Sequence, residues 1–365
     1  MKTLAIRLSL IAVVAAILIT ACGGAPIPAP TQAPQIVEVT RVVAGTPVVE
    51  QVVVTATPPP VVEEKPFRIA LILPSSTNDK EWSQSIYEGV LAVQAEMGAE
   101  NMEIAVSEDT WQIPNAAAAA RDYASQGYDL VITHGAQYGT SLAELAVEFP
   151  QTSFAWGTTT NTFQADGINN IFAYEPKAEQ GGYVNGVMAA MLTKSGTVGI
   201  TGPIEAGDAR LYNAGFTAGA LATKPDLKLN ISYTGSFSDV SLMSAAAETH
   251  IASGADVLSG TSQSVTGAIS VCKNKGVYWF AVAWEQFDLA PDIVAANLIY
   301  RWDGLIVDMI ESHKAGVMGG KAYFLTFKNG GLEMKYNDKI ITPEIKAAAE
   351  AAIKGIEDGT ITLAP

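Results

Sequence analysis

From residue 67 onward, short runs of β-branched and other apolar residues alternate with longer stretches whose apolar positions recur at helical spacing. The short runs predict strands at 68–73, 103–106, 130–133, 153–156, 170–174, 197–201, 229–233, 256–258, 279–283 and 295–300. The longer stretches predict helices at 82–96, 113–125, 140–148, 181–192, 208–222, 241–252, 265–275 and 303–313. Alternation of this kind is typical of parallel sheets that helices cover on both faces.

The predicted strands are too many for one comfortable open sheet, so we expect two sheets, with the join near 173–177. The expected fold class is α/β, with two doubly wound parallel-sheet domains. We expect an N-terminal lobe of 67–173 plus about 290–322, and a C-terminal lobe of 174–289 plus about 323–365. Ligands bind beyond the carboxyl ends of such strands, so the cleft between two facing domains is the expected ligand site.

The first residues of the chain have a different pattern. A basic n-region precedes an apolar run over 8–19, which is shorter than a membrane-spanning helix and is typical of a secretory signal peptide. The segment 19–24 (ITACGG) resembles the cleavage site of bacterial lipoproteins, in which the cysteine carries the lipid. We therefore expect a signal peptide over 1–21 and lipid attachment at Cys22; an ordinary signal peptide with an incidental cysteine is the alternative.

Residues 22–66 are expected to form a tether. The segment 25–66 holds 9 of the 18 prolines, and most of its other residues are Val, Thr, Ala and Gln. Proline at this spacing opposes helix and interrupts sheet, which favours an extended chain. The alternating Val and Thr residues could instead pair as strands, although no partner strand is evident. We expect a lipid-anchored protein of the bacterial cell envelope that faces the periplasm or the cell exterior.

Charge and composition narrow the function classes. The chain of 365 residues has 37 acidic and 22 basic side chains, a formal net charge of −15, so its field repels nucleic acid. Two cysteines, Cys22 and Cys272, cannot build a cysteine-rich zinc site or a disulfide framework, and the three histidines stand far apart. We expect no metal, no cofactor and no nucleic-acid partner.

Sequence motifs for catalysis are not found. The chain has no G-x-S-x-G elbow, no G-x-x-x-x-G-K-[ST] phosphate loop and no G-x-G-x-x-G fingerprint. His134 ends a predicted strand and could act as a base, but a hydrogen bond to a ligand or a strand-end cap suits it better. We expect a protein that is not an enzyme; the alternative, a surface-tethered hydrolase, needs a nucleophile–base pair that the sequence does not reveal.

Large aromatic residues stand at the predicted strand ends or in the first turn of the next helix. They are Trp82, Trp156, Trp284 and Trp302, with Tyr138 and Phe237 in similar positions. Polar residues accompany them, as in Asn78, Asp79, Ser83, His134 and Gln137, and in the segments 202–208 and 260–263. Aromatic faces beside such groups suit a flat, apolar-faced ligand with hydrogen-bonding edges. Core packing of each aromatic residue is the alternative.

The chain resembles the basic membrane protein (BMP) family, substrate-binding lipoproteins of ABC importers whose type members are purine-nucleoside receptors (PnrA-like). The resemblance covers Phe67 to about Tyr336 and rests on the order and spacing of several segments. They are 78–84 (NDKEWSQ) with 87–89 (YEG), 181–190 (GGYVNGVMAA), 197–200 (TVGI), 213–220 (NAGFTAGA) and 253–257 (SGADV). It implies a type I periplasmic-binding-protein fold that closes over a purine-like ligand, and an ABC permease as partner. We expect a monomer.

The resemblance also assigns residues. Trp82 takes the place of the family's first stacking Phe, and Phe237 that of the second. The family's next Asn is Ser83 here, its GVDxDQ turn reads AVAWEQ with Ala283 at the first carboxylate, and its later Lys aligns with Tyr300. That Asp and Lys are associated with the sugar side of the family's ligand, so their joint loss favours a free nucleobase over a nucleoside.

The expected mechanism is hinge closure, with Trp82 and Phe237 clamping the ring from opposite domains. A purine nucleoside or another small polar solute is the alternative ligand, with Glu285 or Asp208 taking over the ribose contacts. The candidate ligand-binding residues are Asn78, Asp79, Trp82, Ser83, His134, Gln137, Tyr138, Trp156, Phe237, Trp284, Glu285, Tyr300 and Trp302.

Overall fold

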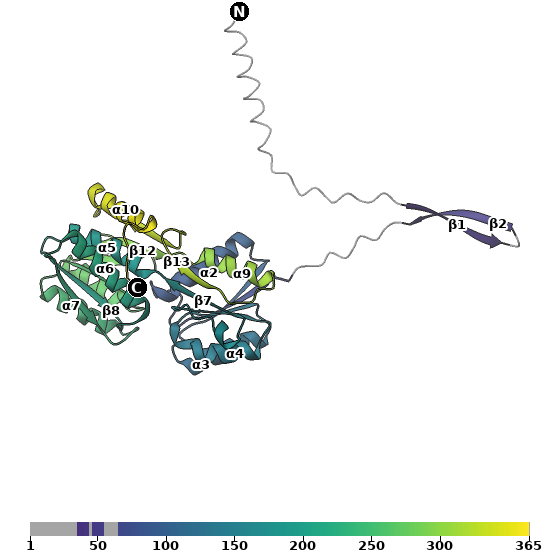
Figure 1. Cartoon of the computed structure of the whole chain (residues 1–365), viewed down its shortest axis with the longest axis horizontal. Helices are drawn as coiled ribbons and strands as arrows, with labels where there is room; N and C mark the ends of the chain where they lie inside the picture. The colour runs from purple at the N-terminus through teal and green to yellow at the C-terminus, as the bar shows by residue number, and fades with distance from the viewer. Residues whose placement is uncertain (1–34, 44–45, 55–64, 365) are drawn as a thin grey trace, which may run out of the picture. The chain divides into compact units, whose positions relative to one another are not determined.

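The computed structural model describes residues 35–43, 46–54 and 65–364, and the chain divides into two compact units after Glu63 (Figure 1). In the smaller unit, β1 (Gln35–Val43) pairs with β2 (Thr46–Val54) as an antiparallel hairpin. This pairing matches the alternative to an extended tether, in which the alternating Val and Thr residues form strands, and each strand supplies the partner of the other. The signal peptide and Cys22 lie outside the described residues.

The larger unit contains two six-stranded sheets. In the first sheet every neighbouring pair of strands is parallel. Its spatial order is β13 (Ala322–Leu325), β7 (Ile171–Pro176), β6 (Ser153–Gly157), β5 (Leu130–Thr133), β3 (Phe67–Ile72) and β4 (Met102–Ser107).

Helices cover both faces of the first sheet, α2 (Trp82–Met97) and α9 (Asp303–Lys314) on one and α3 (Ile113–Ser125) and α4 (Gly139–Glu148) on the other (Figure 1). The strands show why: Ile69 and Leu71 of β3 belong to one core cluster, and the alternate residues Ala70 and Ile72 belong to the other. Side chains of a strand alternate between faces, so an almost wholly apolar strand must be covered twice. Two short 3₁₀ turns complete this lobe, η1 (Ala136–Tyr138) and η2 (Gln164–Asp166).

The second sheet is parallel except at one edge, where β14 runs antiparallel to β12. Its order is β14 (Leu332–Tyr336), β12 (Val294–Tyr300), β11 (Tyr278–Ala281), β10 (Val257–Gly260), β8 (Thr197–Gly202) and β9 (Lys228–Tyr233). The helices of this lobe are α5 (Ala178–Leu192), α6 (Gly207–Thr223), α7 (Val240–Ala252), α8 (Val265–Lys275) and α10 (Pro343–Glu357).

Glycines bring α5 and α6 into close contact. A Cβ atom added at Gly182 would collide with the backbone of Tyr212, and one at Gly215 would collide with the backbone of Glu179. These glycines lie in the segments 181–190 and 213–220 that carry the family resemblance, so the motifs have a packing role. None of the helices in the described ranges is long and apolar enough to span a membrane.

The expected α/β architecture with two doubly wound, mainly parallel sheets is confirmed. Two strands near the C-terminus lie in the other lobe from the one expected. β12 was expected in the first lobe but belongs to the second sheet, and most of β13 was expected in the second lobe but belongs to the first sheet. The chain passes between the sheets after β7, after β12 and after β13. Repeated crossing of this kind joins the lobes through several connecting segments.

Candidate functional site

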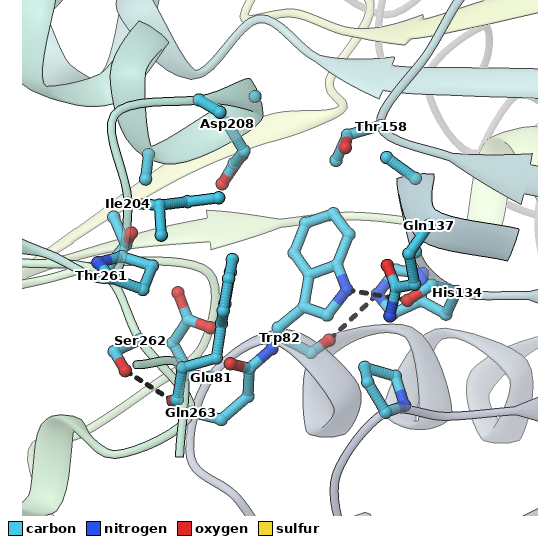
Figure 2. Close-up of a pocket in the computed structure, with 18 of the residues that line it drawn as sticks. Glu81, Trp82, His134, Gln137, Thr158, Ile204, Asp208, Thr261, Ser262 and Gln263 are labelled. Carbon is cyan, nitrogen blue, oxygen red and sulfur yellow. Dashed lines mark hydrogen bonds between the residues drawn. The ribbon is translucent and has the colours of Figure 1, made fainter. Parts of the chain in front are cut away.

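A cavity of about 300 Å³ lies beyond the carboxyl ends of strands from both sheets (Figure 2). The first lobe contributes Pro74, Glu81, Trp82, Trp111, His134, Gly135, Ala136, Gln137 and Thr158. The second lobe contributes Pro203, Ile204, Ala206, Gly207, Asp208, Ala209, Phe237, Thr261, Ser262 and Gln263. This is the position at which open α/β sheets bind ligands, and the volume suits a small molecule.

Trp82 is the first residue of α2, and its place is fixed by the start of that helix. The Asp79 carboxylate accepts hydrogen bonds from the backbone N–H groups of Ser83 (3.0 Å) and Gln84 (3.1 Å), which caps the first turn. The indole Nε1 of Trp82 donates to the carbonyl oxygen of His134 at 3.0 Å. The two rings stack with centroids 4.1 Å apart and planes 13° apart, so His134 covers one face of the indole.

His134 is neutral and has both ring nitrogens occupied. Burial lowers its pKa to about 3. Its Nε2 lies 3.1 Å from the carbonyl oxygen of Trp82, and its Nδ1 lies 2.8 Å from the hydroxyl of Tyr174. A carbonyl only accepts, so Nε2 carries the proton and Nδ1 accepts from Tyr174. His134 therefore orients Trp82 and lines the cavity, but the ligand hydrogen bond expected of it has no free nitrogen in this arrangement.

Trp82 is part of an aromatic cluster that extends away from the cavity. Its members are Trp82, His134, Tyr174, Tyr300 and Trp302. Trp302 is at its centre and meets Trp82, His134 and Tyr174 at centroid distances of 5.6, 5.2 and 5.3 Å, each nearly edge to face. The Trp302 side chain is fully buried, and its Nε1 donates to the Ser85 hydroxyl at 2.8 Å. Edge-to-face packing around this hydrogen-bonded centre fixes the orientation of Trp82 and His134, the two members that line the cavity.

Two acidic side chains line the cavity, one from each lobe. Glu81 is 3% exposed, and Asp208 stands in the first turn of α6. The Tyr300 hydroxyl donates to Asp208 Oδ2 at 3.1 Å, while Asp208 Oδ1 is buried without a hydrogen-bond partner. Burial raises the pKa of Asp208 to about 7, and burial with the nearby Asp79 and Asp208 raises the pKa of Glu81 well above its usual range. Protonation of these acids is therefore sensitive to what occupies the cavity.

A second pair of aromatic residues stands at the mouth of the cavity. Trp111 follows β4 in the first lobe, and Phe237 follows β9 in the second. Their rings lie 4.8 Å apart at 41°, and Trp111 is 40% exposed. The carbonyl oxygen of Phe237 accepts a hydrogen bond from the Ser262 hydroxyl at 2.6 Å. This pair is therefore a contact between the lobes that has one solvent-exposed side.

The family described as PnrA-like ABC transporter substrate-binding proteins (Bmp) matches residues 67–360. The chain belongs to this family. Its relatives include a purine-binding protein of Brucella abortus, 22% identical over 298 residues (82% of this chain and 83% of the relative). They also include the nucleoside-binding protein BmpA of Lactococcus lactis, 27% identical over 311 residues (79% and 86%).

A solved structure shows the same fold. An ABC transporter solute-binding protein from Conexibacter woesei superposes with a TM-score of 0.68 at 21% identity, covering 81% of this chain and 98% of that one. The predicted type I periplasmic-binding-protein fold and the predicted BMP family are thus confirmed. This Bmp family member is an ABC transporter substrate-binding protein, a class that binds small ligands and delivers them to a permease.

Four of the residues expected at the ligand site of this Bmp protein line the cavity: Trp82, His134, Gln137 and Phe237. Figure 2 shows the Trp82 indole projecting into the cavity beside Gln137. The amide nitrogen of Gln137 is buried without a partner, so it is available to a ligand. The two positions that the family resemblance assigned to stacking, Trp82 and Phe237, face the same cavity from different lobes.

Other expected residues lie directly behind the cavity and support it. Asp79 caps α2, and the Ser83 hydroxyl lies 2.7 Å from that of Ser75. Tyr300 holds Asp208, and Trp302 centres the aromatic cluster. Their polar groups are bonded within the protein, so their positions indicate support of the lining residues.

The remaining expected residues lie outside the cavity lining. Asn78 is exposed, and the carboxylate of Glu285 forms an ion pair with Lys335 at 2.8 Å. Tyr138 donates its hydroxyl to the backbone of Thr110, and the Trp156 indole donates to the backbone of Asn161. Trp284 is half-buried and does not line the cavity. The environments of Tyr138 and Trp156 thus fit the core-packing alternative.

Some lining residues were not expected from the sequence. Glu81 directly precedes Trp82, and Trp111 lies between a predicted strand and a predicted helix, the same strand-to-helix position used to select the other aromatics. That signal could have found Trp111. Thr158 carries no distinguishing pattern, since it follows β6 among other threonines.

A serine, a histidine and an aspartate meet elsewhere, near the amino ends of β5 and β6. The Ser153 hydroxyl lies 2.9 Å from His313 Nδ1, and His313 Nε2 lies 3.7 Å from Asp129. However, the Ser153 hydroxyl donates its proton to the carbonyl of Met318 at 2.8 Å, and Ser153 is fully buried. His313 therefore donates to Ser153 rather than activating it, which makes the group a structural link. Over the described ranges, no group of side chains has the arrangement of a metal site.

Proposed function

We propose that this substrate-binding protein captures a purine-type ligand, with a free nucleobase favoured, and presents it to an ABC permease. The observation that carries the proposal is a cavity of about 300 Å³ walled by aromatic faces from both lobes and edged by polar groups. Its named relatives include a purine-binding and a nucleoside-binding protein, which supports the same ligand class.

Each lobe contributes one aromatic surface on which a flat ligand can stack. His134 covers one face of the Trp82 indole, which leaves the rest of that ring to the cavity. Phe237 approaches from the other lobe. A planar ring inserted between them would gain about 1–3 kcal/mol for each aromatic contact. Gln137, Thr261 and Gln263 then offer hydrogen bonds to the edges of the ring.

A ribose would find no charged partner at the two positions that the family resemblance associates with the sugar. Ala283 and Tyr300 stand where the family resemblance places an acid and a lysine, and they are 0% and 1% exposed. The Tyr300 hydroxyl is already bonded to Asp208. Each sugar hydroxyl left unpaired in a closed cleft costs about 1–3 kcal/mol. We therefore propose that a nucleoside binds about tens to hundreds of times more weakly than its free base.

Calorimetric titration of the purified chain with adenine, guanine, hypoxanthine and their nucleosides tests this proposal. The expected result is binding of at least one base, with its nucleoside weaker by the factor given above. Nucleosides that bind as tightly as bases would show that other residues serve the ribose, and the nucleoside alternative would then hold. Failure of every purine to bind would overturn the proposed ligand class.

We also propose that Cys22 carries a lipid and holds a monomeric receptor, with hinged lobes, at the outer face of a bacterial membrane. The support is the segment 19–24, in which small residues precede the cysteine. Replacing Cys22 with Ser should abolish labelling by a fatty-acid probe and leave precursor or released protein. Labelling equal to that of the unmodified chain would contradict the anchor.

A further inference from the structure

We infer that Glu81 and Asp208 select a ligand whose inward edge consists of N–H donors, an amino-substituted or amidine-like nitrogen heterocycle, and that a positively charged edge binds best. The inference rests on the proposed function, because it uses the same cavity, and it specifies which ligands of the flat heterocyclic class are accepted. It depends on the two acids, on unpartnered acceptor atoms and on the absence of a neutralising base.

Glu81 and Asp208 bring carboxyl groups to the cavity from different lobes. Glu81 is only 3% exposed. Asp208 Oδ1 is buried and unpartnered, while Oδ2 is held by Tyr300. Both residues line the cavity, and Figure 2 shows them near Ile204 on one side of the Trp82 indole. Buried carboxyl oxygens without partners are costly, so a ligand that donates to them gains that energy on binding.

The rest of the lining adds acceptors. The amide oxygen of Gln263 is buried without a partner, whereas Gln137 offers one unpartnered donor, its amide nitrogen. Among the buried, unpartnered side-chain atoms of the lining, the acceptors Asp208 Oδ1 and Gln263 Oε1 therefore outnumber the donor Gln137 Nε2, and ionised Glu81 adds further acceptors. A ligand edge made of carbonyl oxygens alone would leave these acceptors unsatisfied.

The charges of the lining residues also favour a cationic ligand edge over an anionic one. Of the lining residues that the structure describes, none is a lysine or an arginine, and His134 is neutral because burial lowers its pKa. An anionic ligand would meet the two acids with no counter-charge. A cation would instead be attracted both by the acids and by the faces of Trp82 and Trp111.

Tyr300 stands at the position where the family resemblance places a positively charged side chain. In the family resemblance this position holds a lysine, which would neutralise an adjacent carboxylate. Here a tyrosine hydroxyl, 3.1 Å from Asp208 Oδ2, supplies a hydrogen bond without a charge. The selectivity inferred for the edge is thus a property of this chain, set by Glu81, Asp208 and Tyr300 together.

Benzamidine, benzamide and benzoate provide a test that does not depend on purines. They are flat, similar in size and respectively cationic, neutral and anionic at the edge. Calorimetric or NMR titration of the full chain should show benzamidine binding about tenfold tighter than benzamide, with benzoate weakest. Glu81→Gln and Asp208→Asn should each remove most of that preference. Glu205→Gln, which removes an exposed acid from the loop just before α6 and outside the cavity lining, is the matched control and should leave the preference unchanged.

The outcomes separate the two proposals. Preference for benzamidine that the Glu81 and Asp208 variants abolish supports the inference, even if no purine binds and the proposed function fails. Purine binding together with equal affinity for the three benzene probes overturns the inference and leaves the proposed function intact. A preference that survives in both cavity variants, or that Glu205→Gln removes equally, also overturns it. Melting curves of each variant establish that the protein tested is folded.

Discussion

Two aromatic regions flank the cavity, and they are built in different ways. In the aromatic cluster, Trp82 is 7% exposed, stacked on His134 and hydrogen-bonded through its indole nitrogen. In the other region, Trp111 is 40% exposed, and Phe237 is half-buried and meets it across the lobes. The first region is held by contacts within one lobe and by segments that cross to it, whereas the second depends on how the lobes approach each other.

If both residues stack on a ligand as proposed, this difference gives the two positions different tasks. Trp82 is a fixed surface whose orientation is set before any ligand arrives, because its neighbours are already packed and bonded. Phe237 lies in the connection between β9 and α7, and its position can follow the closure of the second lobe. In the proposed mechanism, the binding energy from Trp82 is thus pre-organised, and that from Phe237 is gained when the lobes close.

Replacing Trp82 with Ala should have the largest effect, because it removes the fixed surface and opens the aromatic cluster. We expect ligand affinity to fall at least tenfold and the free energy of unfolding to fall by about 3–5 kcal/mol. Trp156→Ala is the matched control: Trp156 is also 7% exposed and also donates through Nε1 to a backbone carbonyl, but it does not line the cavity. Titration calorimetry and denaturant unfolding should show a similar loss of stability in the control with affinity retained. Equal affinity losses would show that Trp82 acts only through stability.

Phe237→Ala tests the aromatic region at the contact between the lobes. We expect affinity to fall about tenfold, with the free energy of unfolding changed by less than about 1 kcal/mol, because the ring is only partly buried. The same titration and unfolding measurements check it. A stability loss as large as that of Trp82→Ala would mean that the two regions are equally structural.

Asp208→Asn should stabilise the ligand-free protein at alkaline pH. The folded-state pKa of Asp208 is raised to about 7, above the ordinary 3.8, by burial. The folded protein therefore holds this proton over a range in which the unfolded chain has lost it, and stability falls as pH rises from about 4 to about 7. Asn abolishes that loss and still accepts from Tyr300, so the variant should be more stable by roughly 1–2 kcal/mol at pH 8. The difference should disappear near pH 4; a pH-independent difference in melting would contradict the assignment.

Trp111→Leu is expected to have the smallest effect, a loss of affinity of about two- to fivefold with unchanged stability, because Trp111 is 40% exposed and leucine retains part of its apolar contact. Calorimetric titration with the base that binds most tightly measures this loss of affinity. An affinity loss exceeding that of Phe237→Ala would make Trp111 a principal stacking residue and would weaken the distinction between the regions.

Much of the fold could be predicted because both sheets are covered on two faces, which gives near-continuous apolar strands between periodic helices. The strands β13 and β14 escaped prediction: both are sheet edges, and their residues are largely half-buried. Helix α10 was not predicted either, although Thr342 caps it and Pro343 opens it, which are readable start signals. The hairpin of β1 and β2 depends on pairing between two weak strands, which neither strand indicates alone.

The site was less predictable, because strand-end position does not reveal where a side chain points or whether its polar atoms already have partners. Trp302 stands at a strand end, yet it is turned inward by its bond to Ser85 and by the rings around it. Conversely, Glu81 looks like an ordinary helix-start acid in the sequence. Only the structure shows that it is buried beside Trp82 in the lining of the cavity.

The most direct measurement is a crystal structure of the chain with the base that binds most tightly. We expect one planar ring between Trp82 and Phe237, in van der Waals contact with the indole, and an amino or ring N–H edge within hydrogen-bond distance of Glu81 or Asp208. A ligand bound elsewhere, such as in the separate hollow between Gly167 and Gly319, or one whose ring avoids Trp82, would contradict it.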